Sequence, residues 1–338
     1  MDVYTLANSR GMEVRFIAYG GIITSIRVPD RAGKLADVTT GFDSPDDYAQ
    51  DGRFFGALIG RYANRISGAC FMLDGRRYSL TPNERGNQLH GGPEGFHRAV
   101  WNVAVRGNEA ELTHQSPDGD QGFPGTLGVR VKYSVTERNE LVVDYSAVTD
   151  APTPVNLTQH AYFNLAGHDC GDIFDHELTL NASRYSPVDA ALLPAGPMRS
   201  VVGTPFDFRT PRRIGERIDE SEEQLVVAYG YDHNFVIDRT DDRQLALAAR
   251  VCEPRSGRVL EILTTEPGIQ FYSGSGVGGG RAGKGGHVYA RNAAFALEPQ
   301  HFPDSPNHPE FPSTILRPGQ EYRSQTVYRF STTPPREN

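Results

Sequence analysis

The amino-acid sequence predicts an all-β fold, a large single-domain β-sandwich with few short helices, and three observations support this prediction. The chain of 338 residues contains 36 glycines and 23 prolines, more turn-forming residues than average composition provides. Apolar and polar residues alternate over several stretches, which is typical of strands that bury one face. Segments with the longer period of a helix are few and short, so strands must build most of the core.

The first predicted elements are a short helix at residues 44–48 and a β-hairpin further along the chain. Ser44 is a favourable N-cap, and Pro45 suits the first helical position. Apolar residues alternate with polar ones over residues 129–135 and again over residues 141–148, with a short polar stretch between them. Two alternating runs joined by a short polar loop predict a pair of antiparallel strands.

The second half of the chain adds a short helix at residues 211–218, which opens with a proline. A second hairpin is predicted from residues 245–252 and 259–264, which flank a turn with Pro and Gly. Further strands are predicted at residues 269–273 and over the alternating run 322–330. Neither helix is long enough to connect parallel strands as a crossover, so the sheets are expected to pack on each other.

Length and composition also limit the class of protein. Residues 1–338 are expected to form one domain, because no repeat, linker or break in composition divides the chain, although the length alone would allow two. The 34 basic and 42 acidic residues give a net charge of −8, which argues against nucleic acid or an anionic membrane as partner. No run of 18 apolar residues predicts a membrane-spanning helix, and Met1–Thr5 shows no signal-peptide pattern. Three well-separated cysteines fit reduced thiols, so a cytoplasmic location is expected.

The glycine-rich segment Gly274–Gly286 contains two apparent nucleotide motifs, and neither meets its structural requirement. Its G-x-G-x-x-G pattern is followed by more glycines and not by a helix that would face a pyrophosphate. Its near match to a P-loop has Gly285 where a Ser or Thr would bind Mg²⁺. No HExxH, Cys–His cluster or G-x-S-x-G pattern is present, so neither a metal site nor a serine nucleophile is expected. The segment is expected to be a loop at the surface or at the rim of a site, and whether it closes on a substrate stays open.

Five segments combine polar residues with aromatics and with glycine or proline. A solvated loop does not need Tyr and Phe, and a core strand does not favour Arg, His, Asp and Glu. Such mixed segments suit a pocket in which polar side chains bind hydroxyl groups and aromatic rings pack against the C–H face of a sugar. The five segments are Gly60–Ile66, Leu89–Gly92, Asn156–Leu165, Tyr231–Phe235 and Leu297–Pro312.

In order and spacing these segments resemble the motifs of the aldose 1-epimerase, or galactose mutarotase, family. The resemblance extends from Gly20 to Tyr328 and includes the NLTQHAYFNL sequence at 156–165 and Leu297-Glu298. It implies the supersandwich fold of galactose mutarotases and an enzyme that interconverts the α and β anomers of free aldohexoses such as glucose and galactose. The small-molecule partner is then a monosaccharide, no cofactor is needed, and the chain is expected to be a monomer or a homodimer.

The resemblance also implies roles for individual residues. His160 would be the general acid that protonates the ring oxygen, and Glu298 would be the general base that takes the proton from the C1 hydroxyl. Both groups are needed, because the ring oxygen is a poor leaving group unless protonated and the anomeric hydroxyl is not ionised at neutral pH. The residues around the sugar would be Asn64, Arg65, His90, Tyr162, Asp232 and Gln270.

Without the family pattern, most of these residues have an ordinary structural interpretation. Arg65 would suit a surface ion pair, His90 before two glycines would suit a turn, and His160 among Tyr and Phe would suit a hydrogen-bonded core position. Glu298 differs from them, because a carboxylate at the end of the apolar run 293–297 needs a partner or a function.

Two other functions stay open from the sequence alone. A carbohydrate-binding or sensor protein without turnover would use the same scaffold, but a pure binder needs no acid–base pair. An epimerase of a phosphorylated or otherwise modified sugar would be expected to add a cluster of Arg and Lys. No such cluster is evident among the motifs.

Overall fold

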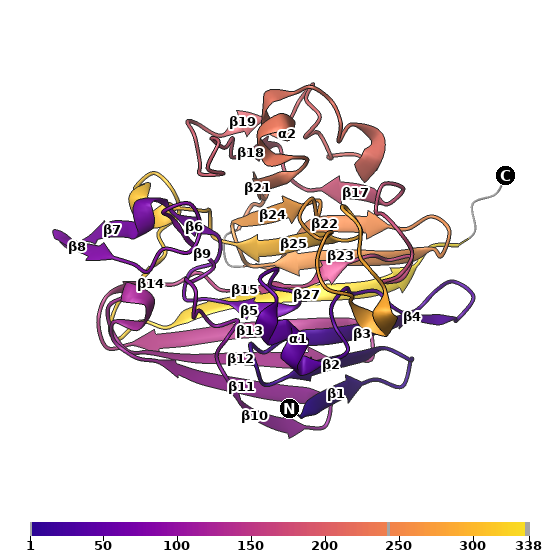
Figure 1. The fold of residues 1–338 in the computed structure, drawn as a ribbon, viewed down its shortest axis with the longest axis horizontal. Helices are drawn as coiled ribbons and strands as arrows, with labels where there is room; N and C mark the ends of the chain where they lie inside the picture. The colour runs from indigo at the N-terminus through magenta and orange to yellow at the C-terminus, as the bar shows by residue number, and fades with distance from the viewer. Residues whose placement is uncertain (1, 242–243, 335–338) are drawn as a thin grey trace.

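The computed structural model describes residues 2–241 and 244–334, and most of its regular structure is β-strand (Figure 1). Its largest sheet has nine strands, and each neighbouring pair is antiparallel. In spatial order the strands are β10 (Asn102–Arg106), β11 (Glu109–Ser116), β12 (Leu127–Val135), β13 (Glu140–Thr149), β27 (Tyr322–Thr332), β23 (Arg258–Thr264), β22 (Ala246–Cys252), β17 (Glu177–Leu180) and β20 (Arg212–Arg213).

Two smaller antiparallel sheets accompany the large one. The six-stranded sheet has the order β16 (Tyr162–Phe163), β25 (Phe295–Gln300), β24 (Gly268–Tyr272), β21 (Asp232–Val236), β18 (Arg184–Tyr185) and β19 (Arg199–Ser200). The four-stranded sheet consists of β1 (Val3–Ala7), β2 (Glu13–Ile17), β3 (Ile23–Pro29) and β4 (Leu35–Asp37).

The remaining strands form four short pairs, and the helices are few. The pairs are β14 (Thr153–Pro154) with β26 (Ile315–Leu316), β15 (Thr158–His160) with β5 (Ala57–Ile59), β6 (Arg65–Ile66) with β9 (Gln88–Leu89), and β7 (Cys70–Leu73) with β8 (Arg76–Ser79). The α-helices of the described residues are α1 (Pro45–Gln50) and α2 (Glu223–Ala228), and 3₁₀ turns lie at residues 67–69, 120–122, 214–216, 284–286 and 305–307.

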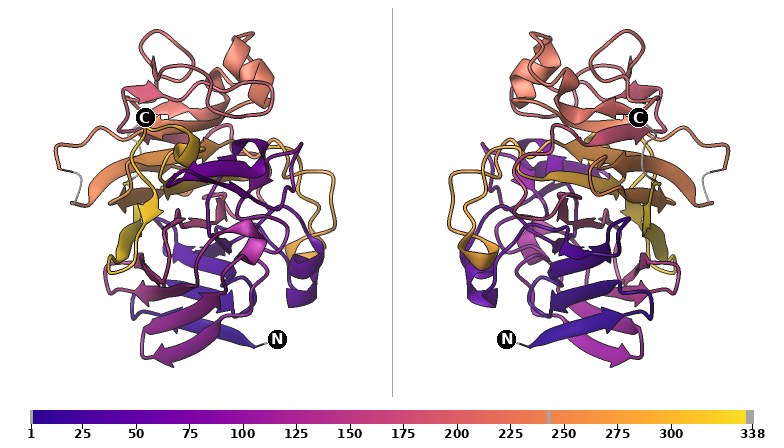
Figure 2. Two further views of the ribbon diagram at one scale, coloured as in Figure 1. Left: turned by 90° about the vertical axis from the view of Figure 1, so that its left-hand side faces the viewer. Right: turned by 90° about the vertical axis from the view of Figure 1, so that its right-hand side faces the viewer.

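The hydrophobic core lies between the sheets, and strands of the large sheet such as β12 turn alternate residues toward it. Along β12, Val129 and Val131 are buried while Arg130 between them is exposed. These valines share one apolar cluster with Phe16 of β2 and Phe271 of β24. Figure 2 shows from both sides that the part with β18, β19 and α2 lies at one end of the molecule and the part with β1 and β10 near the other. This packing of sheet on sheet confirms the predicted all-β sandwich.

The strands predicted from alternation are all present. The two predicted hairpins are β12 with β13 and β22 with β23, and the two other predicted strands are β24 and β27. The helix predicted at residues 44–48 is α1, and Ser44 Oγ accepts a hydrogen bond from the backbone N–H of Asp46, as an N-cap does. Alternation of apolar and polar residues therefore identified these strands correctly.

The helix predicted at residues 211–218 is wrong. Residues 212–213 form the edge strand β20, which pairs with β17, and a single 3₁₀ turn follows at residues 214–216. Pro211 directly precedes this strand, a position at which a missing backbone N–H is tolerated. The helix α2 was not predicted, because its N-cap is Glu222, a residue type outside the preferred caps.

The segment Gly274–Gly286 is a loop that ends in a 3₁₀ turn, and no α-helix follows it within the described residues up to 334. Lys284, the lysine of the apparent P-loop, is buried and donates from Nζ to Asp37 Oδ2 and to the Thr39 carbonyl, each at 2.7 Å. A lysine with these partners is not available to a phosphate, which agrees with the rejection of both nucleotide motifs.

None of the described helices is long and apolar enough to cross a membrane. The three cysteines are free thiols.

Candidate active site

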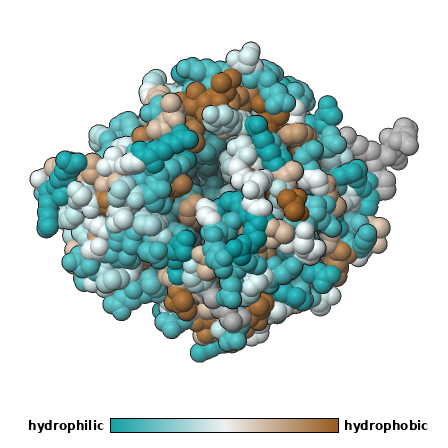
Figure 3. Space-filling model, in the orientation of Figure 1, coloured by the Kyte–Doolittle hydropathy of each residue, from teal (hydrophilic) through white to brown (hydrophobic). Residues whose placement is uncertain are grey.

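Segments far apart in the sequence meet at one cavity of about 210 Å³. Figure 3 shows that the face turned to the viewer in Figure 1 is hollowed near its middle. Seven of the eight residues predicted for the site line the cavity, and Gln270 lies behind one of them. The lining residues are Gly52, Arg53, Phe54, Asn64, Arg65, Leu89, His90, His160, Tyr162, Asp232, Tyr272, Gly276 and Glu298.

Antiparallel pairing of β21, β24 and β25 brings Asp232, Gln270 and Glu298 to one face of the six-stranded sheet. Gln270 lies directly opposite both Glu298 and Asn234 in the register, so these side chains point to the same side. Asp232, two residues before Asn234 on β21, shares that side. Gln270 Nε2 donates a hydrogen bond to Asp232 Oδ1 at 2.7 Å. Gln270 therefore contacts the site indirectly, through its hydrogen bond to the side chain of Asp232.

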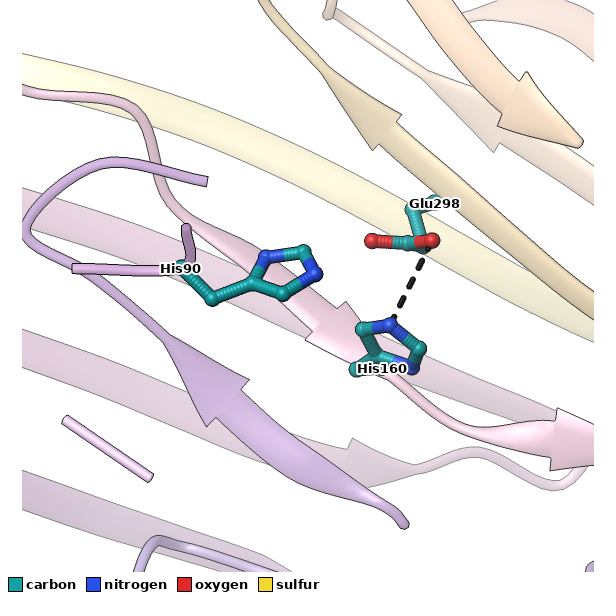
Figure 4. A group of neighbouring side chains, drawn as sticks. All are labelled: His90, His160 and Glu298. Carbon is teal, nitrogen blue, oxygen red and sulfur yellow. Dashed lines mark ion pairs between the residues drawn. The ribbon is translucent and has the colours of Figure 1, made fainter. Parts of the chain in front are cut away.

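His160 and Glu298 face each other from two different strands (Figure 4). Pairing of β15 with β5 places His160 opposite Ala57. His160 Nε2 lies 3.5 Å from Glu298 Oε1, and the two side chains are 4% and 3% exposed. Neither His160 Nδ1 nor Glu298 Oε2 has a hydrogen-bond partner among the described residues. Because 3.5 Å is too long for a strong hydrogen bond, both side chains retain donor and acceptor capacity for a ligand.

His90 points into the same space from the loop after β9 (Figure 4). The backbone N–H of Asn64 donates to His90 Nδ1 at 3.1 Å, so the neutral ring carries its hydrogen on Nε2. Asn64 and His90 have left-handed backbone conformations, with φ of 65° and 52°, a region in which Asn and His are enriched among non-glycine residues. The pairing of β6 with β9 sets both residues at the edge of the cavity.

Arg65 reaches the cavity while its guanidinium is bound from the other side by Glu84. Arg65 Nε donates to Glu84 Oε2 at 2.6 Å, and Arg65 Nη2 donates to Glu84 Oε1 at 2.8 Å. Burial alone lowers the pKa of the Arg65 guanidinium. The hydrogen bonds with Glu84 and the negative charges of Asp232, Glu84 and Glu298 outweigh burial and raise that pKa above its ordinary value. Arg65 therefore stays charged beside two carboxyl groups of the cavity.

Burial shifts the pKa values of the two central groups in opposite directions. Loss of hydration raises the pKa of Glu298 to about 8; the charge of Asp232 adds to the rise, and the charge of Arg65 opposes it. Burial lowers the pKa of His160 to about 4, and it holds the pKa of His90 well below its ordinary value. Between about pH 4 and pH 8 the His160–Glu298 pair therefore holds one proton, mainly on the carboxyl group.

Two imidazoles and a carboxyl group at one point also make a set of potential metal ligands. One atom from each of His90, His160 and Glu298 lies within 4.8 Å of the other two. Zinc accepts such ligands, and two ligand atoms at 2.0–2.1 Å from a tetrahedral ion lie roughly 3.4 Å apart. His160 Nε2 and Glu298 Oε1 are already close to this separation, at 3.5 Å. The sequence-based expectation of no metal stays a prediction.

Arg53 and Phe54 line the cavity but were not predicted. The ring of Phe54 contacts that of His90, with centroids 4.8 Å apart, and forms an aromatic wall. Arg53 Nη1 donates to the carbonyl of Val277 at 2.7 Å and so ties this wall to the glycine-rich loop. The sequence Gly52-Arg53-Phe54-Phe55-Gly56 mixes Arg, aromatics and glycine like the five segments singled out above. That pattern was a usable signal for both residues.

Tyr272 and Gly276 complete the rim of the cavity on the side of the glycine-rich loop. The backbone N–H of Gly276 donates to the Tyr272 hydroxyl at 2.5 Å. Tyr272 follows Gln270 by two positions on β24 and therefore shares its face of the sheet. Gly276 belongs to the segment Gly274–Gly286, which was expected to lie at the surface or at the rim of a site. No motif marked Tyr272, because its contact with the cavity arises only when β24 and the loop fold back together.

Comparison with known proteins points to one family. Residues 2–329 match the aldose 1-epimerase family. Galactose mutarotase from Rattus norvegicus is 44% identical to this chain over 95% of the chain and 91% of its own length. Aldose 1-epimerase from Escherichia coli (strain K12) is 42% identical over 96% of the chain and 94% of its own length.

Solved structures are similar over the same extent. The GalM/aldose epimerase homologue from C. elegans is 33% identical, with a TM-score of 0.91 over 98% of this chain and 99% of its own. Galactose 1-epimerase from Lactobacillus acidophilus is 27% identical, with a TM-score of 0.84 over 98% of this chain and 94% of its own. The match thus includes every strand that contributes to the cavity.

Proposed function

The chain belongs to the aldose 1-epimerase family, and we propose that it interconverts the α and β anomers of free aldohexoses with Glu298 as general base and His160 as general acid. It is an isomerase that acts on a carbohydrate, like its relatives named galactose mutarotase and aldose 1-epimerase. One observation carries the assignment of roles: the buried His160–Glu298 pair, 3.5 Å apart, at a cavity lined by polar and aromatic side chains.

The reaction opens and recloses the pyranose ring without net change in bonds. Glu298 takes the proton of the C1 hydroxyl while the bond between C1 and the ring oxygen breaks, and His160 gives a proton to that ring oxygen. The product is the open aldehyde. Rotation about the C1–C2 bond then presents the other face of the carbonyl group. Ring closure with both proton transfers reversed gives the other anomer and returns each group to its starting state.

The protonation states of the free site are compatible with these roles. The reaction needs a proton on His160 and none on Glu298, whereas burial keeps the proton on Glu298 by raising its pKa and lowering that of His160. Both arrangements contain one proton, so one transfer from carboxyl to imidazole produces the reactive state. The positive charge of Arg65 stabilises the carboxylate formed in this transfer. Neutral groups at rest also avoid burying a charged pair before the sugar arrives.

The size and the polar groups of the cavity support a single monosaccharide as substrate. A volume of about 210 Å³ is below the roughly 300–1,000 Å³ of pockets for drug-sized ligands. Asp232 is an acceptor for paired hydroxyls, and Arg65 and the Nε2–H of His90 are donors. The rings of Tyr162 and Phe54 supply apolar walls for the C–H face of the sugar.

The two arginines that line the cavity support a free aldose over a phosphorylated one. Arg65 is bound by Glu84 at 2.6 Å, and Arg53 is bound by Asp51 at 2.6 Å. The charges of Arg65 and Arg53 are thus already offset by carboxylates. A phosphate group is bound best by an arginine that is free to make two hydrogen bonds to it.

Polarimetry of freshly dissolved α-D-glucose and α-D-galactose tests the proposal. The optical rotation is expected to reach equilibrium faster in proportion to the protein concentration. A drift at the buffer-only rate for every aldose tried would contradict an epimerase. If calorimetry then detected sugar binding without faster drift, the binding or sensor alternative would replace it.

Three finer expectations remain proposals. Residues 1–338 are proposed to form one domain, which is supported by the pairing of β13 with β27 across most of the chain length. A cytoplasmic location is supported by the three free thiols. A monomer or homodimer is proposed for the assembly, and light scattering of the purified protein would decide between the two.

A further inference from the structure

We propose that Glu84 is a positioning residue of the epimerase reaction: it holds the Arg65 guanidinium with its free edge toward the sugar and offsets the charge of Arg65 beside Glu298. The inference rests on the proposed function, in which Arg65 binds the sugar and Glu298 is the general base. Glu84 is not among the residues that line the cavity, so it acts through Arg65.

Both carboxylate oxygens of Glu84 are engaged by one guanidinium. The two bonds, of 2.6 Å and 2.8 Å, run from Nε and Nη2 of Arg65, and a bidentate pair of this kind fixes the plane of the guanidinium. The bonds use two of the five N–H donors, which leaves the two on Nη1 and one on Nη2 for other partners. The side chain of Arg65 is only 7% exposed and that of Glu84 is 26% exposed, so Glu84 shields Arg65 from solvent on the side away from the cavity.

A tight turn holds Glu84 in this place. Glu84 and Asn87 exchange two backbone hydrogen bonds, of 3.2 Å and 2.8 Å. Between them Arg85 and Gly86 have φ of 48° and 84°, and two consecutive left-handed residues are typical of a type I′ turn. The strand β9 that follows this turn pairs with β6, which carries Arg65. Glu84 and its partner thus belong to one small hydrogen-bonded unit at the edge of the cavity.

The charge of Arg65 reaches both carboxyl groups of the cavity. Burial raises the pKa of Glu298 and of Asp232, and the charge of Arg65 lowers both. A carboxylate that is stabilised too strongly is a weaker base, so the general base needs Arg65 near it but not in full contact. Glu84 meets this need, because it binds Arg65 on the side away from the cavity. Its negative charge offsets part of the positive charge of Arg65 that acts on Glu298. The titratable groups that face Glu298 are Arg65, His90, His160, Tyr162, Asp232 and Tyr328.

The variant Glu84→Gln tests this role. The carboxamide can accept one N–H of Arg65, but it turns its own N–H groups toward the other. Arg65 is then expected to turn toward Asp232 and Glu298. Misplacement of a sugar-binding group is expected to lower kcat/KM about tenfold. The alkaline limb of the pH profile of kcat/KM reports the loss of the last proton from the His160–Glu298 pair. This limb is expected to move about half a pH unit or more to lower pH.

A second variant separates charge from geometry. Glu84→Asp keeps the negative charge but is one methylene shorter, so it is expected to draw Arg65 away from the sugar. It should lower kcat/KM about tenfold and should not move the alkaline limb to lower pH, because the negative charge beside Arg65 is kept. The control is Asp74→Asn. This variant removes another bidentate pair, Asp74 with Arg317, whose two bonds are 2.8 Å each. Neither residue of that pair lines the cavity. The control should keep both the wild-type rate and the wild-type limb.

The outcomes distinguish this inference from the proposed function. No turnover by the wild-type protein would overturn the function and the inference together. Wild-type turnover with an unmoved alkaline limb in Glu84→Gln would overturn the inference alone, because a merely structural Glu84 changes stability without changing that limb. If Glu84→Gln does not fold, Glu84→Asp decides: a wild-type kcat/KM in that variant would show that the position of Arg65 does not depend on Glu84.

Discussion

Two histidine–carboxylate pairs lie at strand β25 and just beyond its end, and the proton is bound by opposite partners in the two pairs. His160 and Glu298 are 3.5 Å apart at the cavity, whereas His301 and Glu266 are 2.6 Å apart in the wall of a separate, larger cavity of about 1080 Å³. At the cavity, the pKa of the glutamate is raised and that of the histidine is lowered. In the second pair both shifts are reversed.

The difference arises from the partners of each carboxylate. Glu266 accepts hydrogen bonds from His301 and, at 3.1 Å, from the hydroxyl of Tyr322. Burial would raise the pKa of Glu266, but the charge and hydrogen bond of His301 hold it below its ordinary value. Glu298 has no such donor on Oε2 among the described residues, and Asp232 adds a negative charge nearby. The same two residue types therefore form an ion pair in one place and a neutral pair in the other.

The largest expected effect separates the two pairs by activity. Glu298→Gln and His160→Asn are each expected to lower kcat about 10²–10⁴-fold, because each removes a group that transfers a proton in the transition state. Glu266→Gln is expected to keep kcat close to wild type, since it lies outside the cavity. Polarimetric initial rates at saturating sugar measure all three. Near-wild-type turnover of Glu298→Gln or His160→Asn would mean that the roles are misassigned.

The pH profile should report the cavity pair alone. The values of kcat/KM are expected to stay level between about pH 4 and pH 8, the pKa values of His160 and Glu298, because one proton is then shared by the pair. Below that range a second proton blocks the base, and above it the last proton is lost, so the rate falls on both sides. Glu266→Gln, as the control, should show the same two limbs. A profile with its alkaline limb near pH 6 would argue against the raised pKa of Glu298.

The two glutamates should affect the free energy of unfolding with opposite signs. The folded state raises the pKa of Glu298 from 4.5 to about 8, so it binds the proton more tightly than the unfolded state, and stability is lost as pH rises across that interval. Glu298→Gln removes this loss and should be about 1–3 kcal/mol more stable than wild type at pH 8. Urea unfolding at pH 5 and pH 8 measures the effect, and the gain should be larger at pH 8.

For Glu266 the sign is reversed. Its pKa is lowered on folding, so its contribution to stability is present above pH 4.5 and is lost as pH falls through its folded pKa. The pKa of His301 is raised on folding. Its contribution to the free energy of unfolding is therefore complete below pH 6.5 and declines as pH rises through the pKa of His301 in the folded state. Glu266→Gln should therefore be about 1–3 kcal/mol less stable than wild type at pH 6. A stabilising effect at that pH would refute the ion pair.

The smallest expected effect concerns metal. Dialysis against EDTA is expected to leave kcat/KM unchanged, because the proposed proton transfers need only His160 and Glu298. The measurement is polarimetry before and after dialysis, with a zinc-restored sample as the control. A loss of activity that zinc restores would assign the cluster of His90, His160 and Glu298 to metal binding.

The elements of the fold differ in how far their residues alone could predict them. The alternation over residues 129–135 and 141–148 extends across many positions, and both strands were found. Residues 212–213 form a strand only because β17 lies beside them, and a proline before them suggested a helix instead. Short elements of this kind depend on contacts with distant residues and carry no periodic pattern of their own.

The site shows the same division. His160 and Glu298 lie in segments whose mixture of aromatics with ionisable groups marks them in the sequence. Glu84 was not predicted, because an acidic residue beside Asn83 and Arg85 looks like an ordinary exposed turn. The role proposed for Glu84 rests on its two bonds to Arg65, which only the structure shows.

By itself the sequence determined the all-β class and the family and singled out His160 and Glu298 as candidates for proton transfer, because alternation and motif are properties of neighbouring residues. Only the tertiary structure decided which histidine–carboxylate pair is neutral and which is ionic. Protonation depends on burial, on the separation of the two groups and on the charges around them. Folding sets all three when it brings β15 to β25 and places Asp232 and Arg65 beside Glu298.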